Sequence, residues 1–340
     1  MDRQDRKHSI AKSLNNTFDI DIEAVADIDN DNDNDNDNEV IRSPTDRSPS
    51  PTLLNVSSSR TPSVSRRFLN QLSRSIDTTS KATHAIAIYS CFLTGLTAAP
   101  SFAACYVWCG FQTGNAAQLG LAIARTWTPG ADDGFQIFDR QALVSLLSFL
   151  CGATLGQIGN KVGGRRRCWL VGATMGMMTF MLGAALAAHF SGENGIATGR
   201  GDPSWVTPTG MLALALSSVT MGLQGAVGCR LGSPLGCTVP LTSTWVDIFN
   251  DPFLFALKHV RTRDVRLMGA FSLIFGACVS RCLMILMGTP GTMGVIVGFR
   301  AIQGVWWIFA PDEPRKEDQF GGEGRRGSEM SQVTCVEQKR

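Results

Sequence analysis

Charged residues are scarce in the central part of this 340-residue chain. Residues 86–311 contain 14 lysines and arginines and 8 aspartates and glutamates, so 22 of these 226 positions are charged. Soluble globular domains are charged at roughly 25% of their positions. The mean hydropathy of +0.04 and the net charge of +2 conceal this difference because the flanking segments are very polar. The central part is therefore too apolar for a soluble domain, and it predicts an all-α membrane protein.

Features of several other protein classes are also missing. The near-neutral net charge and the lack of a basic stripe exclude a nucleic-acid-binding protein. The sequence has no phosphate-binding loop, serine-hydrolase elbow or zinc-protease motif, so we expect no catalytic residue and no enzymatic activity. Most of the ten cysteines lie in apolar runs without neighbouring histidines, where cysteine acts as a small hydrophobic residue. We therefore expect neither a metal site nor a cofactor.

The two ends of the chain have the composition of disordered segments. We predict a disordered cytoplasmic tail over residues 1–80 and another over 312–340, because neither segment can bury enough apolar surface to fold. A DN repeat at 29–38 lacks the glycine and glutamate that a calcium loop requires. Apolar residues recur every four positions in 64–76 and predict an amphipathic helix on the membrane surface, although a plain basic flank is the alternative. Ser-Pro and Thr-Pro pairs favour kinases as partners of the tails.

Six apolar runs are long enough to cross the hydrocarbon core of a bilayer, which takes about 20 helical residues. They are residues 86–109, 141–160, 168–190, 208–229, 267–287 and 292–310. Two further runs, 112–126 and 234–256, are interrupted by polar residues or prolines, and we interpret them as short broken or re-entrant helical segments. No cleavable signal peptide opens the sequence, so we expect the first span to act as the membrane signal.

Basic residues concentrate in two short loops and predict the orientation. They are Lys161, Arg165, Arg166 and Arg167 in one loop, and Lys258, Arg261, Arg263 and Arg266 in the other. The positive-inside rule places both loops on the cytoplasmic side, and six spans then place both termini there as well. We therefore expect a multi-pass integral membrane domain over residues 81–311. No motif indicates which membrane holds it.

The two halves of this domain share one order of features. Each has a long span, an interrupted segment, and then an arginine ahead of a glycine-containing span; these arginines are Arg140 and Arg266. Three crossings in each half would insert the second half upside down relative to the first. This is the inverted 3+3 repeat of many secondary transporters, whose sites lie where the two broken segments meet.

Glycines recur at intervals of three or four residues in several spans and predict close helix packing. They are Gly152, Gly156, Gly159 and Gly163 in one span, Gly172 and Gly176 in the next, and Gly294 and Gly298 in the last.

Two segments carry a resemblance to a known family. GFQTGNAAQLGLA at 110–122 and PLTSTWVDIFNDP at 240–252 resemble the YoaK-like membrane proteins, the family of domain of unknown function 1275 (DUF1275). The resemblance covers residues 85–310, and its most specific part is Thr113-Gly114-Asn115. It implies a multi-pass membrane protein and carries no established substrate or site. The polar N-terminal tail lies outside the family domain and resembles a fungal-type extension.

Polar residues inside the apolar runs are candidates for a substrate site. The first cluster is Thr113, Gly114, Asn115 and Gln118, and the second is Thr242 and Thr244 with Gln224 on the preceding span. The alternative for the first cluster is helix capping, in which Thr113 or Asn115 satisfies the free amides of a buried helix start. Asp247 and Arg300 are ionisable residues within apolar runs, where a charge is costly and often functional. Asp247 could bind a proton or cation, and Arg300 could bind an anionic substrate. The alternatives are a structural pair between these two residues, or Asp247 as a wetted residue at a segment end.

Together these features predict a small-solute or ion transporter with a site between the two broken segments. The alternative is a non-transporting membrane scaffold or regulator whose polar segments only satisfy packing. A transporter would need a central polar cavity that both broken segments bound. The expected partners are the lipid bilayer and a small polar solute or ion, and the sequence indicates no oligomeric state.

Overall fold

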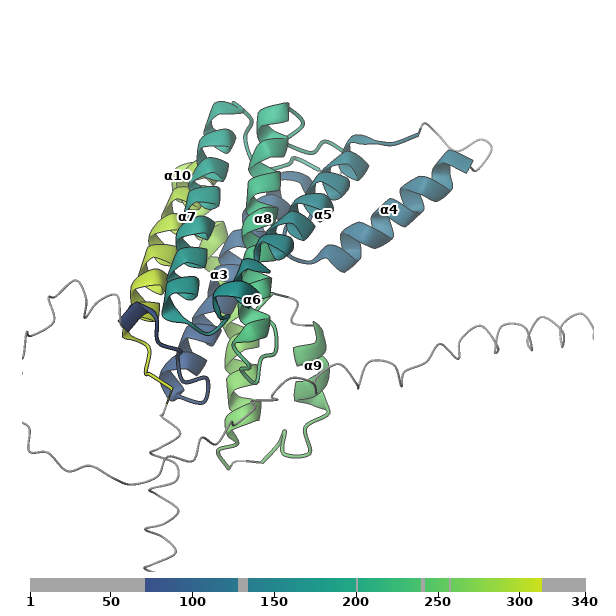
Figure 1. Ribbon diagram of the computed structural model, residues 1–340. Helices are drawn as coiled ribbons and strands as arrows, with labels where there is room; N and C mark the ends of the chain where they lie inside the picture. The colour runs from purple at the N-terminus through teal and green to yellow at the C-terminus, as the bar shows by residue number, and fades with distance from the viewer. Residues whose placement is uncertain (1–70, 128–133, 200, 240–241, 257, 314–340) are drawn as a thin grey trace, which may run out of the picture. The chain divides into compact units, whose positions relative to one another are not determined.

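The computed structural model describes residues 71–127, 134–199, 201–239, 242–256 and 258–313, all of them within the unit Thr61–Arg340. Most of the two predicted tails lies outside these residues. Within them the regular elements are helices, shown in Figure 1: α3 (Lys81–Cys105), α4 (Gln112–Trp127), α5 (Ile137–Leu155), α6 (Ile158–Val162), α7 (Arg167–Phe190), α8 (Pro208–Arg230), α9 (Thr242–Phe249) and α10 (Arg261–Phe309). The all-helical architecture is as predicted.

Five of the described helical stretches are long and apolar enough to cross a membrane. They are α3, the combined α5–α6 stretch Ile137–Val162, α7, α8 and α10. Their lengths and compositions identify an integral membrane protein. The last two predicted spans differ from expectation, because they are joined in the single 49-residue α10.

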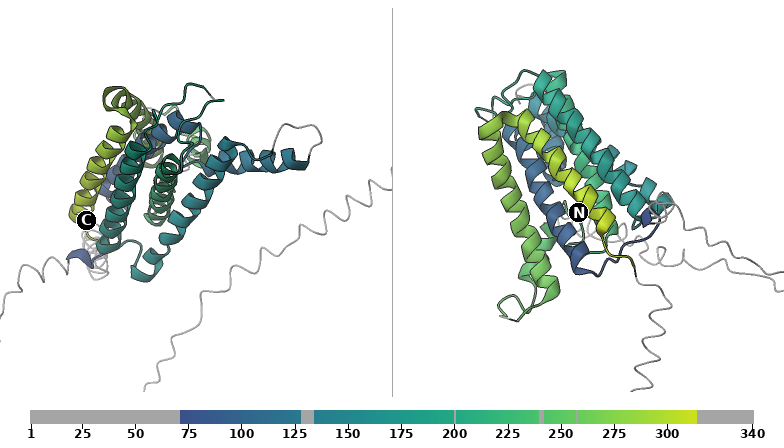
Figure 2. Two further views of the ribbon diagram at one scale, coloured as in Figure 1. Left: turned by 90° about the horizontal axis from the view of Figure 1, so that it is seen from above. Right: turned by 90° about the vertical axis from the view of Figure 1, so that its left-hand side faces the viewer.

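Helix α10 doubles back at Gly288. This residue has φ 73° and ψ 175°, a conformation outside the helical region that glycine adopts without steric cost. At the start of α10, Nη2 of Arg261 lies 3.3 Å from Nδ1 of His84, near the start of α3. Just past its end, the carbonyl of Pro311 accepts a hydrogen bond of 2.9 Å from the amide of Asp77. Both ends of α10 therefore lie beside the start of α3, and α10 is a hairpin with a first arm, 261–287, and a second arm, 289–309 (Figure 2).

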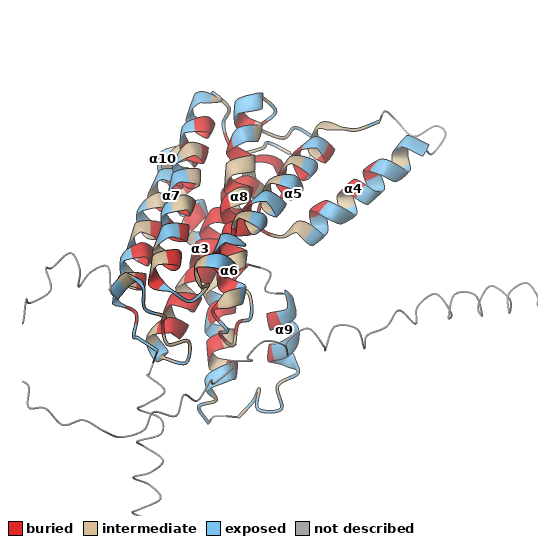
Figure 3. Cartoon of the chain, in the orientation of Figure 1, coloured by how far each residue is buried: buried red, intermediate tan, exposed pale blue. Residues whose placement is uncertain are grey.

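The helices pack in two groups, α3 with α10 and α5 with α8, and α7 contacts both groups. Helix α3 packs against α10, α8 packs against α5 and α7, and α7 also contacts α10. Helix α4 packs on α5, and α9 packs on α10. Figure 3 shows the buried faces concentrated where α3, α7, α8 and α10 meet, whereas α4 is largely exposed.

Four glycines form the closest helix contacts. Gly95 of α3 faces Gly276 of the first arm of α10, and Gly222 of α8 faces Gly152 of α5. A Cβ atom on any of the four would overlap with a backbone carbonyl oxygen of the facing helix. Small residues at these positions let the helix backbones approach closely, as is common in membrane bundles.

The glycine positions predicted from spacing are confirmed only in part. Gly152 packs on the backbone of α8, and Gly156 packs on the side chain of Ala226. The prediction is wrong within this chain for Gly172, Gly294 and Gly298, because no atom lies within 4 Å of a Cβ built there. Residue spacing identifies a small-residue face but not the helix that covers it.

Both basic loops lie at the end of the bundle where α3 begins. The carbonyl of Arg165 accepts a hydrogen bond of 3.0 Å from Ile76, and Arg261 lies beside His84. The α7–α8 loop lies at the opposite end, since its Ala197 amide donates to the carbonyl of Ala103 near the end of α3 at 2.8 Å. The two basic loops thus lie at the same end of the bundle, which is the arrangement that the positive-inside argument requires.

Glu193 organises the α7–α8 loop at that opposite end. Its carboxylate accepts hydrogen bonds of 2.9 Å from the amides of Val206 and Thr207, just before α8 begins. Burial raises the pKa of Glu193, but hydrogen bonds from Thr207, Val206 and Ser204 outweigh it and leave the pKa below its usual value. The loop is therefore tied to an ionised carboxylate.

Short segments beside α3 and α10 join the two predicted tails to the fold. Arg74 lies 2.7 Å from Asp312, and Arg167 donates to both Asp312 and the carbonyl of Ala310. Burial raises the pKa of Asp312, but these two arginines outweigh it and lower the pKa below its usual value. We call residues 74–77 and 310–313, together with Arg167, the terminal clasp.

The clasp corrects the predicted tail boundaries and the end of the predicted amphipathic helix, of which residues 71 and 72 are helical. Ser75 and Ile76 form isolated bridges with Arg166 and Asp312, so residues 73–76 are not helical. Ile76 is fully buried rather than lying on a membrane surface. Residues 64–70 of the predicted helix lie outside the described part of the chain. The backbone pairing is favoured over a surface helix because it buries Ile76 and satisfies its amide.

Candidate functional site

A buried polar network lies where α3, α7, α8 and the second arm of α10 meet. Its centre is Arg300 of the second arm, which is 0% exposed. Nη2 of Arg300 lies 2.9 Å from Oε1 of Gln224 on α8 and 3.3 Å from Oγ1 of Thr97 on α3. Nη1 lies 3.3 Å from the sulfur of Met177 on α7. One guanidinium therefore contacts three other helices.

The network continues along α3. Nε2 of Gln224 donates to the carbonyl of Ser90 at 2.9 Å and to Oγ1 of Thr94 at 2.7 Å. Nε2 of Gln303, one turn after Arg300, donates to Oγ of Ser90 at 2.8 Å. All of these side chains are buried. Buried polar groups need such partners, since each unpaired one is costly.

The charge of Arg300 has no acidic partner within the described residues. The ion pairs of the described chain involve other residues, mostly near helix ends. Nε of Arg300 and Oε1 of Gln303 are buried without a hydrogen-bond partner. An unneutralised buried charge is costly, so the network can still accept a ligand that supplies negative charge.

The structure separates Arg300 from Asp247, which corrects the predicted pair between them. Asp247 is on α9, its side chain is 49% exposed, and its Oδ2 lies 3.2 Å from Nη2 of Arg266. Asp247 is thus a residue of a segment end rather than a buried acid. On the same helix Thr242 is exposed, and Thr244 is buried with its hydroxyl 3.4 Å from the carbonyl of Leu235.

The predicted polar cluster of α4 mainly forms hydrogen bonds to neighbouring parts of the chain. Thr113 and Gly114 are exposed, whereas Asn115 is buried. Nδ2 of Asn115 donates to the carbonyl of Trp108 at 2.9 Å and to Oε1 of Gln112 at 2.8 Å. Asn115 therefore links α4 to the connection from α3. It donates to a carbonyl and does not accept from a backbone amide of the described residues, so it is not the helix cap of the alternative.

The two broken segments do not come together. Helix α4 packs on α5 and α9 packs on α10, and Figure 1 shows α4 and α9 well apart. The expected site between residues 112–118 and 242–247 is therefore not formed in this conformation. Of the predicted site residues, the structure brings Gln224 and Arg300 into direct contact.

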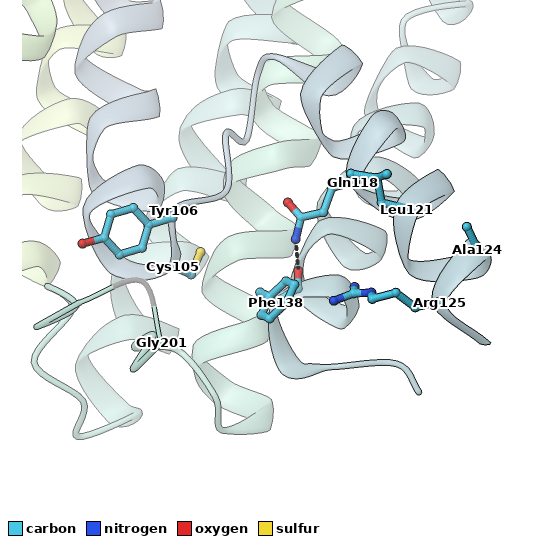
Figure 4. A pocket seen from close by; sticks show the side chains of 8 residues that line it. All are labelled: Cys105, Tyr106, Gln118, Leu121, Ala124, Arg125, Phe138 and Gly201. Atoms are coloured by element: carbon cyan, nitrogen blue, oxygen red, sulfur yellow. Dashed lines mark hydrogen bonds between the residues drawn. The ribbon is translucent and has the colours of Figure 1, made fainter. Parts of the chain in front are cut away.

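A pocket of about 640 Å³ opens between α4, α5 and the end of α3 (Figure 4). Its lining residues are Cys105, Tyr106, Gln118, Leu121, Ala124, Arg125, Phe138 and Gly201. Nε2 of Gln118, a predicted site residue, donates to the carbonyl of Phe138 at 3.2 Å, and the guanidinium of Arg125 lies 5.3 Å from the centre of the Phe138 ring. The pocket is bounded by α4 and not by α9, so it is not the expected cavity between both segments.

A family model described as protein of unknown function (DUF1275) matches residues 86–306. The chain belongs to the DUF1275 family. The resemblance seen in the sequence is thereby confirmed, while the fungal-type extension stays a prediction. No curated protein and no solved structure matches the chain.

The part that matches the DUF1275 family contains the whole Arg300 network, whereas residues 74–77 and 310–313 of the terminal clasp fall outside it and only Arg167 of the clasp lies within it. Within the described residues of this DUF1275 member, no group of three or more histidine, cysteine, aspartate or glutamate side chains could hold a metal ion. The chemistry available at the network is therefore hydrogen bonding and the single positive charge of Arg300.

Sequence reasoning missed several buried polar residues of this DUF1275 protein. Ser90, Thr94 and Thr97 lie on one face of α3, at spacings of four and three that place them in one stripe. This stripe is the signal that could have identified them. Asp139 was also missed; it is 0% exposed and lies 2.6 Å from Arg125. Its position at the start of an apolar run suggested a solvated loop end.

Proposed function

We propose that this protein is a transporter of a small solute or ion, built from two inverted halves that together cross the membrane six times. Its substrate site is the network around Arg300. The observation that carries the proposal is a buried charge that joins helices of both halves. Charged residues within membrane-spanning helices are costly and commonly mark substrate or ion pathways.

Six crossings follow if each arm of α10 spans the bilayer. At 1.5 Å per residue the arms are about 40 Å and about 31 Å long, against a hydrocarbon core of about 30 Å. Their ends lie together beside α3, as the contacts of Arg261 and Pro311 show. A hairpin of this length fits two crossings with a turn at Gly288.

The paired glycine contacts support inverted halves. Helix α3 of the first half crosses the first arm of α10 of the second half at Gly95 and Gly276, and α8 of the second half crosses α5 of the first half at Gly222 and Gly152. The residues that Arg300 contacts occupy matching positions, since Thr97 follows Gly95 by two residues and Gln224 follows Gly222 by two. In the two inverted halves α3 therefore corresponds to α8, and α5 corresponds to the first arm of α10.

The broken segments fit the same pairing. Asn115 of α4 bonds to the carbonyl of Trp108 in the connection from α3, and Thr244 of α9 bonds to the carbonyl of Leu235 in the connection from α8. Helix α4 packs on α5, and α9 packs on α10. Inverted repeats place such segments at opposite ends of the bundle, and the interface of the repeats holds the site in known transporters. Arg300 lies at that interface.

We propose that the end carrying both basic loops and the terminal clasp faces the cytoplasm, which would place both termini there. The pocket of Figure 4 then opens at the other end. Cys105 lines this pocket, and Thr97 contacts Arg300 from eight residues earlier on α3, about 12 Å along the helix axis. The helices between them are packed, so the conformation is closed around Arg300, and transport would require helix movement.

Uptake into liposomes tests the proposal. The full chain is reconstituted, and uptake of inorganic anions, carboxylates, sugars, amino acids and cations is compared with empty liposomes. For a solute that enters, Arg300→Gln is expected to abolish uptake. Arg281→Gln is the matched control, because Arg281 is an exposed arginine on the same helix, and it is expected to keep uptake.

The alternative function is a non-transporting membrane scaffold or regulator. The observation that favours it is the complete burial of Arg300 among packed helices. Correctly folded protein that moves none of these solute classes would support the scaffold and contradict transport. Uptake that Arg300→Gln leaves unchanged would contradict the assignment of the site.

A further inference from the structure

We propose that Arg300 binds a small monovalent anion, which takes the place of the sulfur of Met177. This names the substrate class of the proposed transporter, and its role in transport rests on that proposed function. Binding of the anion itself does not depend on transport and is tested separately.

The first argument is charge. The groups within hydrogen-bond distance of the guanidinium are a side-chain amide, a hydroxyl and a thioether, and all of these are neutral. Arg300 is 0% exposed, so water does not screen its charge. A guanidinium stays protonated in proteins and therefore requires negative charge nearby or carries a high desolvation cost. A bound anion would supply that charge.

The second argument is the weakness of one partner. Nη1 of Arg300 points to the sulfur of Met177 at 3.3 Å. A thioether is a weak hydrogen-bond acceptor, and the unbranched methionine side chain changes rotamer readily. Rotation of Met177 would free one N–H of the guanidinium and open the space that its sulfur fills. The Thr97 hydroxyl accepts from Nη2 and keeps its own O–H, which can donate to the same anion.

The third argument sets the charge and size of the ligand. Arg300 is the one charged side chain among the described members of the network, so a single negative charge neutralises it. A second negative charge would remain unpaired in a medium of low polarity. Because the guanidinium is fully enclosed, the ligand is limited to about the volume that Met177 vacates.

Thermal unfolding of the purified full chain tests binding. Wild type is heated in detergent with sodium chloride, nitrate or formate, or with sodium gluconate, at one ionic strength. At least one small anion is expected to raise the Tm above its value in gluconate, by about 5–10 °C at about 100 times its Kd. Arg300→Gln is expected to lose this shift, whereas Arg281→Gln keeps it.

Met177→Leu keeps the test decisive if Arg300→Gln does not fold. Leucine has a volume similar to that of methionine and accepts no hydrogen bond, so only an anion could pair with Nη1. The anion concentration needed for a Tm rise of a set size is therefore expected to fall severalfold relative to wild type. Equal Tm values in gluconate and in all three small anions would overturn the anion site. The anion site would also be overturned if Met177→Leu left unchanged, or raised, the anion concentration needed for that Tm rise.

Liposome uptake separates failure of the anion site from failure of transport. An anion-dependent Tm shift that requires Arg300, without uptake of any solute, would support the anion site and overturn transport. Uptake of a sugar or a cation by protein without an anion-dependent shift would support transport and overturn the anion site. Uptake of the stabilising anion that Arg300→Gln abolishes would support both.

Discussion

Replacing Gly276 by alanine is expected to push α3 and the first arm of α10 apart. The new Cβ atom would overlap with the carbonyl oxygen of Phe92, and the next nearest atoms are the carbonyl carbon of Phe92 and the amide nitrogen of Leu96. All of these atoms belong to the backbone of α3, so no side-chain rotation relieves the overlap. The two helices must separate, which also weakens the facing contact of Gly95.

The expected loss can be bounded from known packing effects. An added methyl group in a tightly packed interior costs about 1–3 kcal/mol. Alanine returns at most about 1 kcal/mol through its higher helix propensity. The net loss therefore lies between roughly 0 and 3 kcal/mol, and a central value of about 1–2 kcal/mol lowers the Tm by roughly 2–8 °C for a domain of this size.

Thermal unfolding in detergent measures this loss, and the chain offers a matched control. Gly298 lies in the second arm of the same helix with open space around its Cα, so Gly298→Ala is expected to leave the Tm unchanged or slightly higher. Gly222→Ala is expected to lose about as much as Gly276→Ala, because its contact with α5 has the same form. A Tm for Gly276→Ala at or above that of Gly298→Ala would refute the reasoning.

Three further predictions concern the ends of the bundle and the break before α4. Glu193→Gln is expected to destabilise the protein by about 1 kcal/mol at pH 7, after allowance for solvent screening. Because the folded-state pKa of Glu193 is lowered, this difference from wild type is present above the ordinary carboxylate pKa and is lost as the pH falls through the folded-state value; Tm values across pH measure it. Asp312→Asn is expected to speed limited proteolysis at Arg74, because both arginines of the terminal clasp lose their charged partner. Asn115→Ala is expected to lower the stability by about 1 kcal/mol through the loss of its hydrogen bonds to the Trp108 carbonyl and to Gln112, without affecting the anion-dependent Tm shift.

Each of these predictions has an outcome that contradicts it. A Glu193→Gln difference that persists unchanged at acidic pH would show that packing, not ionisation, holds the loop. Unaltered cleavage at Arg74 in Asp312→Asn would show that the backbone bridges alone hold the clasp. Loss of the anion-dependent shift in Asn115→Ala would place Asn115 in the binding site rather than at a helix break.

The apolar runs of the sequence predicted the helices well. The run at 168–190 became α7 (Arg167–Phe190), and the run at 208–229 became α8 (Pro208–Arg230). The interrupted run at 112–126 became the separate α4 (Gln112–Trp127). These predictions succeed because chain hydropathy and helix-breaking residues act locally and are read directly from the sequence.

The contacts between residues on different helices could not be predicted in the same way. Arg300 was identified as unusual, but its contacts with Gln224 and Thr97 depend on how three helices pack. The sequence leaves two roles open for Asp247, a partner of Arg300 or a wetted segment end, and its exposure and its contact with Arg266 agree with the segment end. Hydropathy gives the amount of apolar surface on each helix and does not indicate which neighbour covers it.

The terminal clasp has a consequence for biosynthesis. Arg74 and Asp312 are separated by 238 positions in the chain, so the clasp closes only after the last helix has been made. At about 5–20 residues per second, the ribosome needs roughly 10–50 s to supply the second half of this contact. During that time Ile76 lacks the partners that later bury it, among them Trp307 and Ala310. Closure of the clasp is thus a late step of assembly, and it distinguishes a completely inserted chain from one that still lacks its final hairpin.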